Sequence, residues 1–329
     1  MKYLLVLGLL FSTIVNAVEV KRGDYRDRAD VAAFIVQMAS RSDYSEQELA
    51  ELFSTVSKQD HLFELLNKPA EKELQWYQYR PIFIKEKRID LGVKFWREHQ
   101  QLLSEVSTKT GVPEQIIIAV IGVETFYGIY KGKDPVLDSL VTLAFDYPKR
   151  GEFFTHELEQ FLLLVKEQNL DPVGLLGSYA GAMGMPQFIS SSYRSYAVDF
   201  DGDGQANLFD SVADITASVA NYFVKHGWRA NEAIAGPLTA LENNTIDKLE
   251  PGVKPVYKWS DLAQNGLQSN TELDPDTAVA LVKLEQRNQP EYWAGLQNFY
   301  VITRYNHSEL YAMAVYQLSL LIKARMERS

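Results

Sequence analysis

The chain of 329 residues contains no cysteine, and this absence removes several kinds of chemistry at once. Cysteine-bound zinc, iron–sulfur clusters, thiol nucleophiles, disulfides and thioether-linked lipid anchors are all excluded. Positive charge is also scarce, because 33 Lys and Arg residues stand against 43 Asp and Glu residues and the net charge is −10. A general nucleic-acid binder needs a basic face to neutralise phosphates, so we expect no nucleic-acid partner.

Two common hydrolase motifs are missing as well. The histidines, which are His61, His99, His156, His226 and His307, form no HExxH pair, and that class of zinc enzyme is therefore excluded. No G-x-S-x-G segment marks the nucleophile turn of a serine hydrolase. We interpret each isolated histidine as a surface group or a satisfied core group.

Long apolar runs are absent except at the N-terminus, where Met1–Ala17 reads MKYLLVLGLLFSTIVNA. The positive Lys2, the apolar run Leu4–Phe11 and the small-x-small site Val15–Ala17 are typical of a cleavable secretory signal peptide. An uncleaved N-terminal anchor is the alternative. No later stretch reaches 18 apolar residues, so we expect a soluble, exported protein with no membrane span after cleavage.

Helical periodicity dominates the rest of the chain. Apolar residues recur at helical spacing over about 29–67, 89–108, 112–128, 153–168, 212–226 and 308–325. Between 236 and 290, prolines and glycines separate short apolar pieces such as Ala278–Leu284, which predicts a small strand-containing insert. The expected fold class is mostly α (α+β). The predicted units are a signal peptide (1–17), an N-terminal α region (18–75), a helical core (76–235), a small β-containing domain (236–290) and a C-terminal helical segment (291–329).

Glu124 stands near the C-terminal end of a helix that is apolar nearly all round. The run Ile116–Val123 precedes it, and such a helix is expected to be buried. No cation lies three or four residues from Glu124, so the helix itself offers no salt bridge. Burial of an unpaired carboxylate is costly and raises its pKa, and a general acid for glycosidic-bond cleavage needs this property. Pairing with a distant arginine is the alternative interpretation.

The segment Gly177–Phe188 is rich in small residues. It lacks the Lys-Ser/Thr pair of a P-loop and follows no clear strand, which argues against nucleotide binding. Small residues allow a backbone to approach another backbone or a flat ligand closely. Gln187 at its end offers donors and acceptors for hydroxyl or amide groups. Tight packing between helices is the alternative.

An aspartate-rich loop begins at Asp199 and matches the pattern D-x-D-x-D-G. Alternating carboxylates followed by a turn-forming glycine are typical of an EF-hand calcium loop. The predicted ligands are Asp199, Asp201, Asp203, Gln205 through its backbone carbonyl, Asp210 and Asp214. Whether Asp210 or Asp214 closes the loop is left open, because Asp210 stands where Glu is usual. A solvated acidic turn without a metal is the alternative.

A set of segments in this order and spacing resembles the lytic murein transglycosylase B family. These segments are Gly122–Thr125, Ala144–Pro148, Gly177–Gly184, Gln187–Phe188 and Ala197–Gly204, extended by Trp76, Tyr79–Arg80, Ser218–Tyr222 and Tyr300–Asn306. The resemblance covers most of the mature chain and is weakest before residue 70 and across 236–290. Two departures are the missing cysteine that many members lipidate and the uncommon pair Met185–Pro186.

The resemblance implies a lysozyme-like helical core with an additional α domain and a small β-containing domain. It implies a periplasmic enzyme that cleaves the β-1,4 bond between N-acetylmuramic acid and N-acetylglucosamine in peptidoglycan strands and leaves 1,6-anhydromuramic acid ends. Proteins of cell-wall synthesis are candidate partners. The implied residues are Glu124 as the single catalytic acid/base, Tyr79, Ser178, Tyr179, Gln187, Tyr222, Tyr300 and Tyr305 for the substrate, and the Asp199 loop for a structural calcium ion. Catalysis itself would need no cofactor.

A second catalytic carboxylate is not obvious in any apolar segment. Asp134, Asp138 and Asp146 lie in stretches that we expect to be polar and solvated, and Asp138 alone is kept as a possible second acid. Two other functions remain open. One is a lysozyme-type muramidase with water as the nucleophile, and the other is a non-catalytic, calcium-dependent wall-binding protein.

Overall fold

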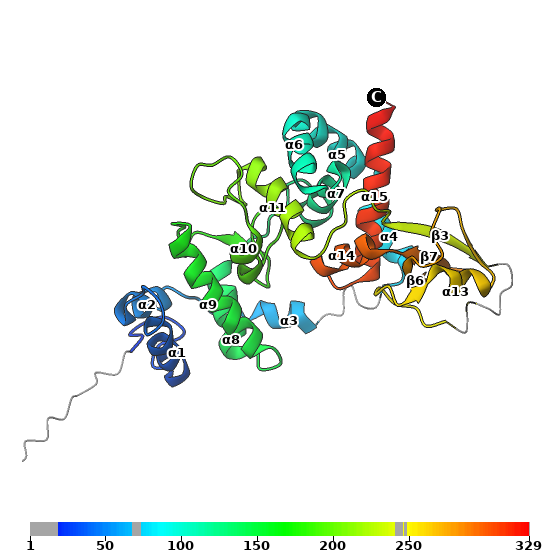
Figure 1. Cartoon of the computed structure of the whole chain (residues 1–329). Helices are drawn as coiled ribbons and strands as arrows, with labels where there is room; N and C mark the ends of the chain where they lie inside the picture. The colour runs from blue at the N-terminus through cyan, green and yellow to red at the C-terminus, as the bar shows by residue number, and fades with distance from the viewer. Residues whose placement is uncertain (1–18, 68–73, 241–245, 247–248, 329) are drawn as a thin grey trace, which may run out of the picture.

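The computed structural model describes residues 19–67, 74–240, 246 and 249–328. The signal peptide predicted for Met1–Ala17 lies outside these residues. Within them, no helix combines the length and the apolar character needed to cross a membrane. Helices dominate the described chain (Figure 1), which confirms the mostly α prediction.

The region predicted as helical over 29–67 forms three short helices. They are α1 (Ala29–Ala39), α2 (Glu46–Phe53) and α3 (His61–Asn67). Ser45 caps α2 through reciprocal hydrogen bonds with Glu48, which satisfies backbone groups at the start of the helix. The rings of Phe34 and Phe53 lie 5.8 Å apart and hold α1 against α2. Helices α1 and α2 therefore form a small N-terminal module at one end of the molecule, and α3 lies apart from them (Figure 1).

The central part of the chain is largely helical. Its elements are α4 (Trp76–Phe83), α5 (Glu86–Glu98), α6 (Gln100–Thr110), α7 (Glu114–Thr125), β1 (Asp134–Pro135), α8 (Val136–Asp146), α9 (Gly151–Glu167), β2 (Leu176–Gly177), α10 (Ser190–Tyr196) and α11 (Val212–Lys225). Helices α5, α6 and α11 contact α7, whose residues 116–123 are all buried. The apolar run that predicts a buried helix thus forms the centre of the core.

The stretch around Asp138 and Asp146 corrects the expectation of a solvated segment. It forms α8, whose apolar face is buried against α9. Asp138 is half-buried, accepts a hydrogen bond of 3.1 Å from Gln59 Nε2, and has its pKa raised by burial. Asp146 forms an ion pair of 2.6 Å with Arg28. Both carboxylates therefore help to attach the N-terminal module to the core.

The strand-containing region carries a five-stranded antiparallel sheet with the order β4-β6-β7-β3-β5. Its elements are β3 (Ala235–Ala240), β4 (Tyr257–Lys258), α13 (Trp259–Gln264), β5 (Leu267–Ser269), β6 (Ala278–Leu284) and β7 (Glu291–Gly295). Strand β7 lies in the segment that was expected to be helical from residue 291, so the sheet extends to Gly295. A separate small core under this sheet includes Leu262, Leu267 and Leu281.

Two C-terminal helices return the chain to the core. They are α14 (Gln297–Tyr305) and α15 (Glu309–Glu327). Helix α15 packs against α4, α5 and α7, and the predicted stripe of Tyr311, Val315, Leu318 and Ile322 is buried (Figure 1). The last helix of the chain thereby places Tyr311 against the helix that carries Glu124.

Candidate active site

Glu124 lies in the last turn of α7, at the edge of the core. Its side chain is half-buried, while residues 116–123 before it in the helix are buried. Tyr311 Oη of α15 donates a hydrogen bond of 2.6 Å to Glu124 Oε1. The ring of Tyr311 is only 2% exposed, so this donor is held rigidly by the core. The structure therefore combines one carboxylate, reachable from solvent, with one fixed phenol.

The backbone turns sharply directly after Glu124. Phe126 and Tyr127 have φ values of 54° and 61°, which place two non-glycine residues in the left-handed region. Each such residue costs about 1–3 kcal/mol and persists only where its surroundings hold it. Here Tyr127 Oη donates to the carbonyl of Arg88 at 2.9 Å, and the Tyr127 ring covers Gly122 so closely that a Cβ there would lie 2.5 Å from its hydroxyl.

A cluster of aromatic rings extends from Tyr311. Tyr305 stacks on Tyr311 with 6.3 Å between ring centroids and an interplanar angle of 10°. Tyr222 lies 4.9 Å from Tyr305, and Phe188 lies 5.6 Å from Tyr222. The rings come from α11, α14, α15 and the segment before α10, so the fold brings together residues that are remote in the sequence.

The hydroxyl groups of this cluster are kept protonated. Burial raises the pKa of Tyr222, and it raises the pKa values of Tyr305 and Tyr311 well above the usual range, with the negative charge of Glu124 as a further cause for the last two. A phenol in this state can donate but cannot ionise near neutral pH. Tyr222 Oη donates to the carbonyl of Arg304 and Tyr305 Oη to that of Pro186, each at 2.6 Å.

The glycine-rich segment forms a loop in which backbones approach closely, and it does not pack helix against helix. A Cβ on Gly184 would lie 2.4 Å from the carbonyl oxygen of Leu208. Ser178 Oγ accepts hydrogen bonds from the loop's own backbone, including one of 3.0 Å from Ala182 N. Gln187 Nε2 donates to the carbonyls of Gly184 and Lys131 at 2.9 and 3.2 Å. Both polar side chains therefore shape the loop.

The remaining residues predicted to bind substrate occupy different environments. Tyr79 is only 2% exposed, lies 5.0 Å from Phe83 between ring centroids, and influences the titration of Tyr311. Tyr179 is 39% exposed on the glycine-rich loop. Tyr300 carries the guanidinium of Arg304 over its ring at 4.4 Å. Binding roles for these three residues stay predictions.

A chain of hydrogen bonds joins the helix of Glu124 to the aspartate loop. Thr125 Oγ1, next to Glu124, donates to the carbonyl of Met185 at 2.9 Å. The backbone N–H of Met185 donates to the carbonyl of Leu208 at 2.9 Å. Leu208 is buried within the segment that closes the aspartate loop. The end of α7 is therefore fixed relative to both loops.

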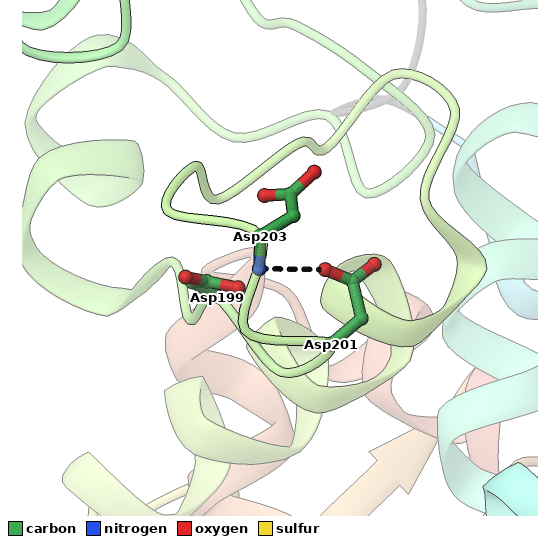
Figure 2. A group of neighbouring side chains, drawn as sticks. All are labelled: Asp199, Asp201 and Asp203. Carbon is green, nitrogen blue, oxygen red and sulfur yellow. Dashed lines mark hydrogen bonds between the residues drawn. The ribbon is translucent and has the colours of Figure 1, made fainter.

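The aspartate loop gathers three exposed carboxylates. Oxygen atoms of Asp199, Asp201 and Asp203 lie within 4.8 Å of one another (Figure 2). Asp199 accepts from the N–H groups of Gly202 and Gly204 at 2.7 and 2.9 Å, and Asp201 accepts from Asp203 N at 3.3 Å. Hard oxygen ligands converging from alternate positions are the donor set that Ca²⁺ prefers, so these residues fit a calcium ion.

The two residues proposed to close the loop lie outside this group of carboxylates. Asp214 is buried, and its carboxylate accepts from the backbone N–H groups of Phe200 and Asn207 at 2.7 and 2.8 Å. Asp210 is exposed, and its Oδ1 atom lies 3.5 Å from Lys131 Nζ. Gln205 is exposed and anchors its N–H on Asp203 Oδ1 at 2.9 Å. Their roles as metal ligands stay predictions.

Tyr311 is the site residue that the sequence did not reveal. The periodicity of the last helix predicts only that Tyr311 is buried, and it is. No local pattern links it to a carboxylate that lies 187 positions earlier. A tyrosine within an otherwise aliphatic stripe was the one available signal, since buried hydroxyls usually have partners.

A carboxyl group set at the edge of an apolar helical core is the kind of general acid that cleaves glycosidic bonds. The model of the "Transglycosylase SLT domain" family matches residues 26–320, and the chain belongs to this family. It is a lytic transglycosylase with a lysozyme-like fold.

Individual relatives agree with this assignment. The chain is 41% identical over 305 residues to the membrane-bound lytic murein transglycosylase B of Escherichia coli (strain K12), covering 90% of this chain and 83% of the relative. It resembles the structure of the E. coli lytic transglycosylase Slt35 in complex with calcium, with 39% identity, a TM-score of 0.87, and coverage of 95% and 98% of the two chains. It also resembles SltB3 from Pseudomonas aeruginosa in complex with NAG-NAM-pentapeptide, with 26% identity, a TM-score of 0.79, and coverage of 88% and 78%.

Proposed function

We propose that this transglycosylase cleaves the β-1,4 bond between N-acetylmuramic acid and N-acetylglucosamine in peptidoglycan strands and leaves 1,6-anhydromuramic acid ends. The observation that carries the proposal is the hydrogen bond of 2.6 Å from Tyr311 Oη to the half-buried Glu124. It supports a mechanism in which Glu124 alone first donates a proton and then accepts one. The pentapeptide complex of SltB3 supports a peptidoglycan substrate.

The proposed reaction begins with proton transfer from the Glu124 carboxyl group to the glycosidic oxygen. The bond between that oxygen and C1 of the muramic acid then breaks, and the N-acetyl oxygen of the same sugar stabilises the positive charge at C1. The 6-hydroxyl of the sugar attacks C1, and the Glu124 carboxylate accepts the hydroxyl proton. Attack within one sugar has a large entropic advantage over attack by water. A second carboxylate, as ordinary glycosidases use, is then unnecessary.

Tyr311 has a positioning role in this scheme. As a protonated donor it fixes one carboxylate oxygen and stabilises the charge that forms when Glu124 releases its proton. Because burial keeps the pKa of Tyr311 well above its usual range, the donor is present throughout the working pH range.

The substrate is proposed to lie along the aromatic cluster and the glycine-rich loop. Tyr300 would offer a ring face to a sugar. Tyr222 and Tyr305, whose rings stack on His226 and Tyr311, would line the sugar site from within the cluster. Tyr179 is the exposed ring of the loop, and Ser178 and Gln187 would keep the loop in place while presenting hydrogen-bonding atoms. Tyr79 would act from within the core.

A calcium ion is proposed to bind the aspartate loop. Asp199, Asp201 and Asp203 would hold it, with the Gln205 carbonyl and either Asp210 or Asp214 completing the set. The calcium complex of Slt35 supports the choice of metal. The ion would stabilise the loop and take no part in the reaction.

The enzyme is proposed to act in the periplasm after removal of residues 1–17. The sequence of this segment and the location of peptidoglycan outside the cytoplasmic membrane support the proposal. Proteins of cell-wall synthesis are proposed as partners on the same ground, since they share the substrate.

The direct test of the catalytic residue is Glu124→Gln. The substitution keeps the shape and the acceptor for Tyr311 and removes the acid. We expect release of soluble fragments from purified sacculi to fall by about 10³-fold or more, as for loss of an essential acid/base. Glu152→Gln, at an exposed position of α9, is the matched control and should keep full activity. A Glu124→Gln enzyme with parental activity and parental thermal stability would show that another group is the catalyst.

A further inference from the structure

Three cations cluster at the start of α5. Lys85 is the residue before the helix, and Lys87 and Arg88 lie in its first turn. The N-terminal end of a helix carries a partial positive charge, so cations there are unfavourable by about 0.3–1 kcal/mol each. Glu86, the acidic residue among them, is paired with Arg325 at 2.6 Å. Unfavourable cations at a helix N-terminus, in a chain of net charge −10, indicate that this position has a function.

Two of these cations lie against an aromatic residue that follows Glu124. The Arg88 guanidinium is 4.8 Å from the centroid of the Phe126 ring, and Lys87 Nζ is 5.9 Å from the same ring. The ring of Tyr130, which is 70% exposed, lies 6.0 Å from that of Phe126. We call this surface the cationic patch; it consists of Lys85, Lys87, Arg88, Phe126 and Tyr130.

The positive charge of the patch is not neutralised within the described part of the chain. None of its three cations forms an ion pair with a described carboxylate, whereas many other lysines and arginines do. Arg88 donates to the carbonyl of Ile82 at 2.8 Å, but its Nε atom is buried and has no acceptor among the described residues. Lys85 and Lys87 are exposed, so the patch offers their ammonium groups and its positive charge to an anionic ligand.

The patch borders the candidate active site. Phe126 is two positions after Glu124, so their Cα atoms are at most about 7.6 Å apart. The hydrogen bond from Tyr127 Oη to the carbonyl of Arg88 fixes the start of α5 to this turn. A strand bound at Glu124 would bring its substituents within reach of the long lysine side chains.

We propose that the cationic patch binds free carboxylate groups of the peptide stems on the glycan strand, next to the bond that is cleaved. The proposal rests on the proposed function, because peptide stems are the anionic substituents of that substrate. Guanidinium and ammonium groups bind carboxylates, and aromatic rings accommodate the apolar part of a peptide. A bilayer surface is a poorer occupant, because lipid covering Phe126 and Tyr130 would crowd the approach of a strand to Glu124.

The test measures binding in a Glu124→Gln background, so that it does not depend on turnover. Two ligands are compared by calorimetry: strands that carry peptide stems and the same strands stripped of stems by an amidase. With Lys85→Glu and Lys87→Glu combined, we expect the ratio of the two affinities to fall at least about fivefold, because opposite charge at an interface sets preference. Lys21→Glu combined with Lys254→Glu, two exposed lysines elsewhere, is the matched control and should leave the ratio unchanged.

The outcomes separate this proposal from the proposed function. Cleavage by the parent enzyme with anhydro products tests the function alone. An unchanged affinity ratio in the Lys85/Lys87 double variant would overturn the patch proposal, even with cleavage intact. Another outcome is that the double variant loses the parent's sedimentation with anionic vesicles (phosphatidylglycerol in phosphatidylcholine) while its ratio of strand affinities stays unchanged. That result would likewise overturn the patch proposal and would assign the patch to a membrane surface.

Discussion

At the scale of single residues, the candidate site depends on the pair Glu124 and Tyr311. The sequence alone indicates Glu124 but not Tyr311. Glu124 stands out because an acidic side chain follows an apolar helical run without a local cation. Tyr311, its partner, is 187 positions away, and only the packing of α15 on α7 brings the two together. Asp138 shows the converse, because a residue expected to be solvated is held by Gln59 and half-buried on a helix.

Tyr311→Phe tests the positioning role of the phenol. A hydrogen bond to a charged group contributes about 1.5–3 kcal/mol, so we expect kcat to fall about 10–100-fold with little change in KM. The alkaline limb of the pH–rate profile should move to higher pH, because the carboxylate loses a donor that favours its ionised form. Steady-state kinetics on soluble glycan strands across pH measure both effects. A lower kcat with an unmoved profile would indicate a purely structural role for Tyr311.

At the scale of elements, apolar stripes predicted most of the long helices, and their failures have identifiable causes. The pattern predicts a helix to residue 128, but α7 ends at Thr125 because Phe126 and Tyr127 adopt left-handed conformations. Contacts with α5 hold that turn, and no local sequence encodes them. Helix α8 was missed because its aspartates obscure an apolar stripe. Strand β7 was missed because it is only five residues long, although it pairs with its neighbour β6 as well as with the more distant β3.

Gly122→Ala tests how tightly the turn after Glu124 is packed. The new Cβ would lie 2.5 Å from the hydroxyl of Tyr127 and under 3 Å from its ring, so the ring must move. We expect a loss of about 1–3 kcal/mol in the free energy of unfolding, together with reduced activity, because Tyr127 anchors the turn. Denaturant unfolding and strand cleavage provide the two readouts. Gly252→Ala, where no atom lies within 4 Å of the added Cβ, is the control; equal effects of both substitutions would contradict this packing argument.

At the scale of the whole molecule, the site is assembled by segments from most of the chain. Helix α7 supplies the carboxylate of Glu124 and α15 the phenol of Tyr311. Helices α11 and α14 supply further rings, and the loop at Met185 connects α7 to the aspartate loop. The sequence could indicate the carboxylates of that loop, because their spacing is local. The Thr125–Met185–Leu208 connection and the cationic patch require the tertiary fold, since each joins segments that are remote along the chain.

Removal of calcium tests the proposed role of the aspartate loop in overall stability. A ligand that binds only the folded state stabilises it by mass action, so a chelator should lower the Tm, and added Ca²⁺ should restore it. A double substitution, Asp199→Asn with Asp201→Asn, should melt at the lower temperature with or without chelator. Scanning calorimetry of the parent and of the double variant, each with chelator and with added Ca²⁺, measures these Tm values. A parental Tm that is insensitive to chelator and to Ca²⁺ would argue for a solvated acidic turn.

The central claim is that a single carboxylate releases its proton and then accepts one from the sugar that attacks itself. Mass spectrometry of fragments released by the parent enzyme from purified sacculi tests this claim most directly. We predict muramic acid ends that are lighter by one water than reducing ends, in every early product. Fragments that carry only reducing ends would show that water is the nucleophile and would contradict the account.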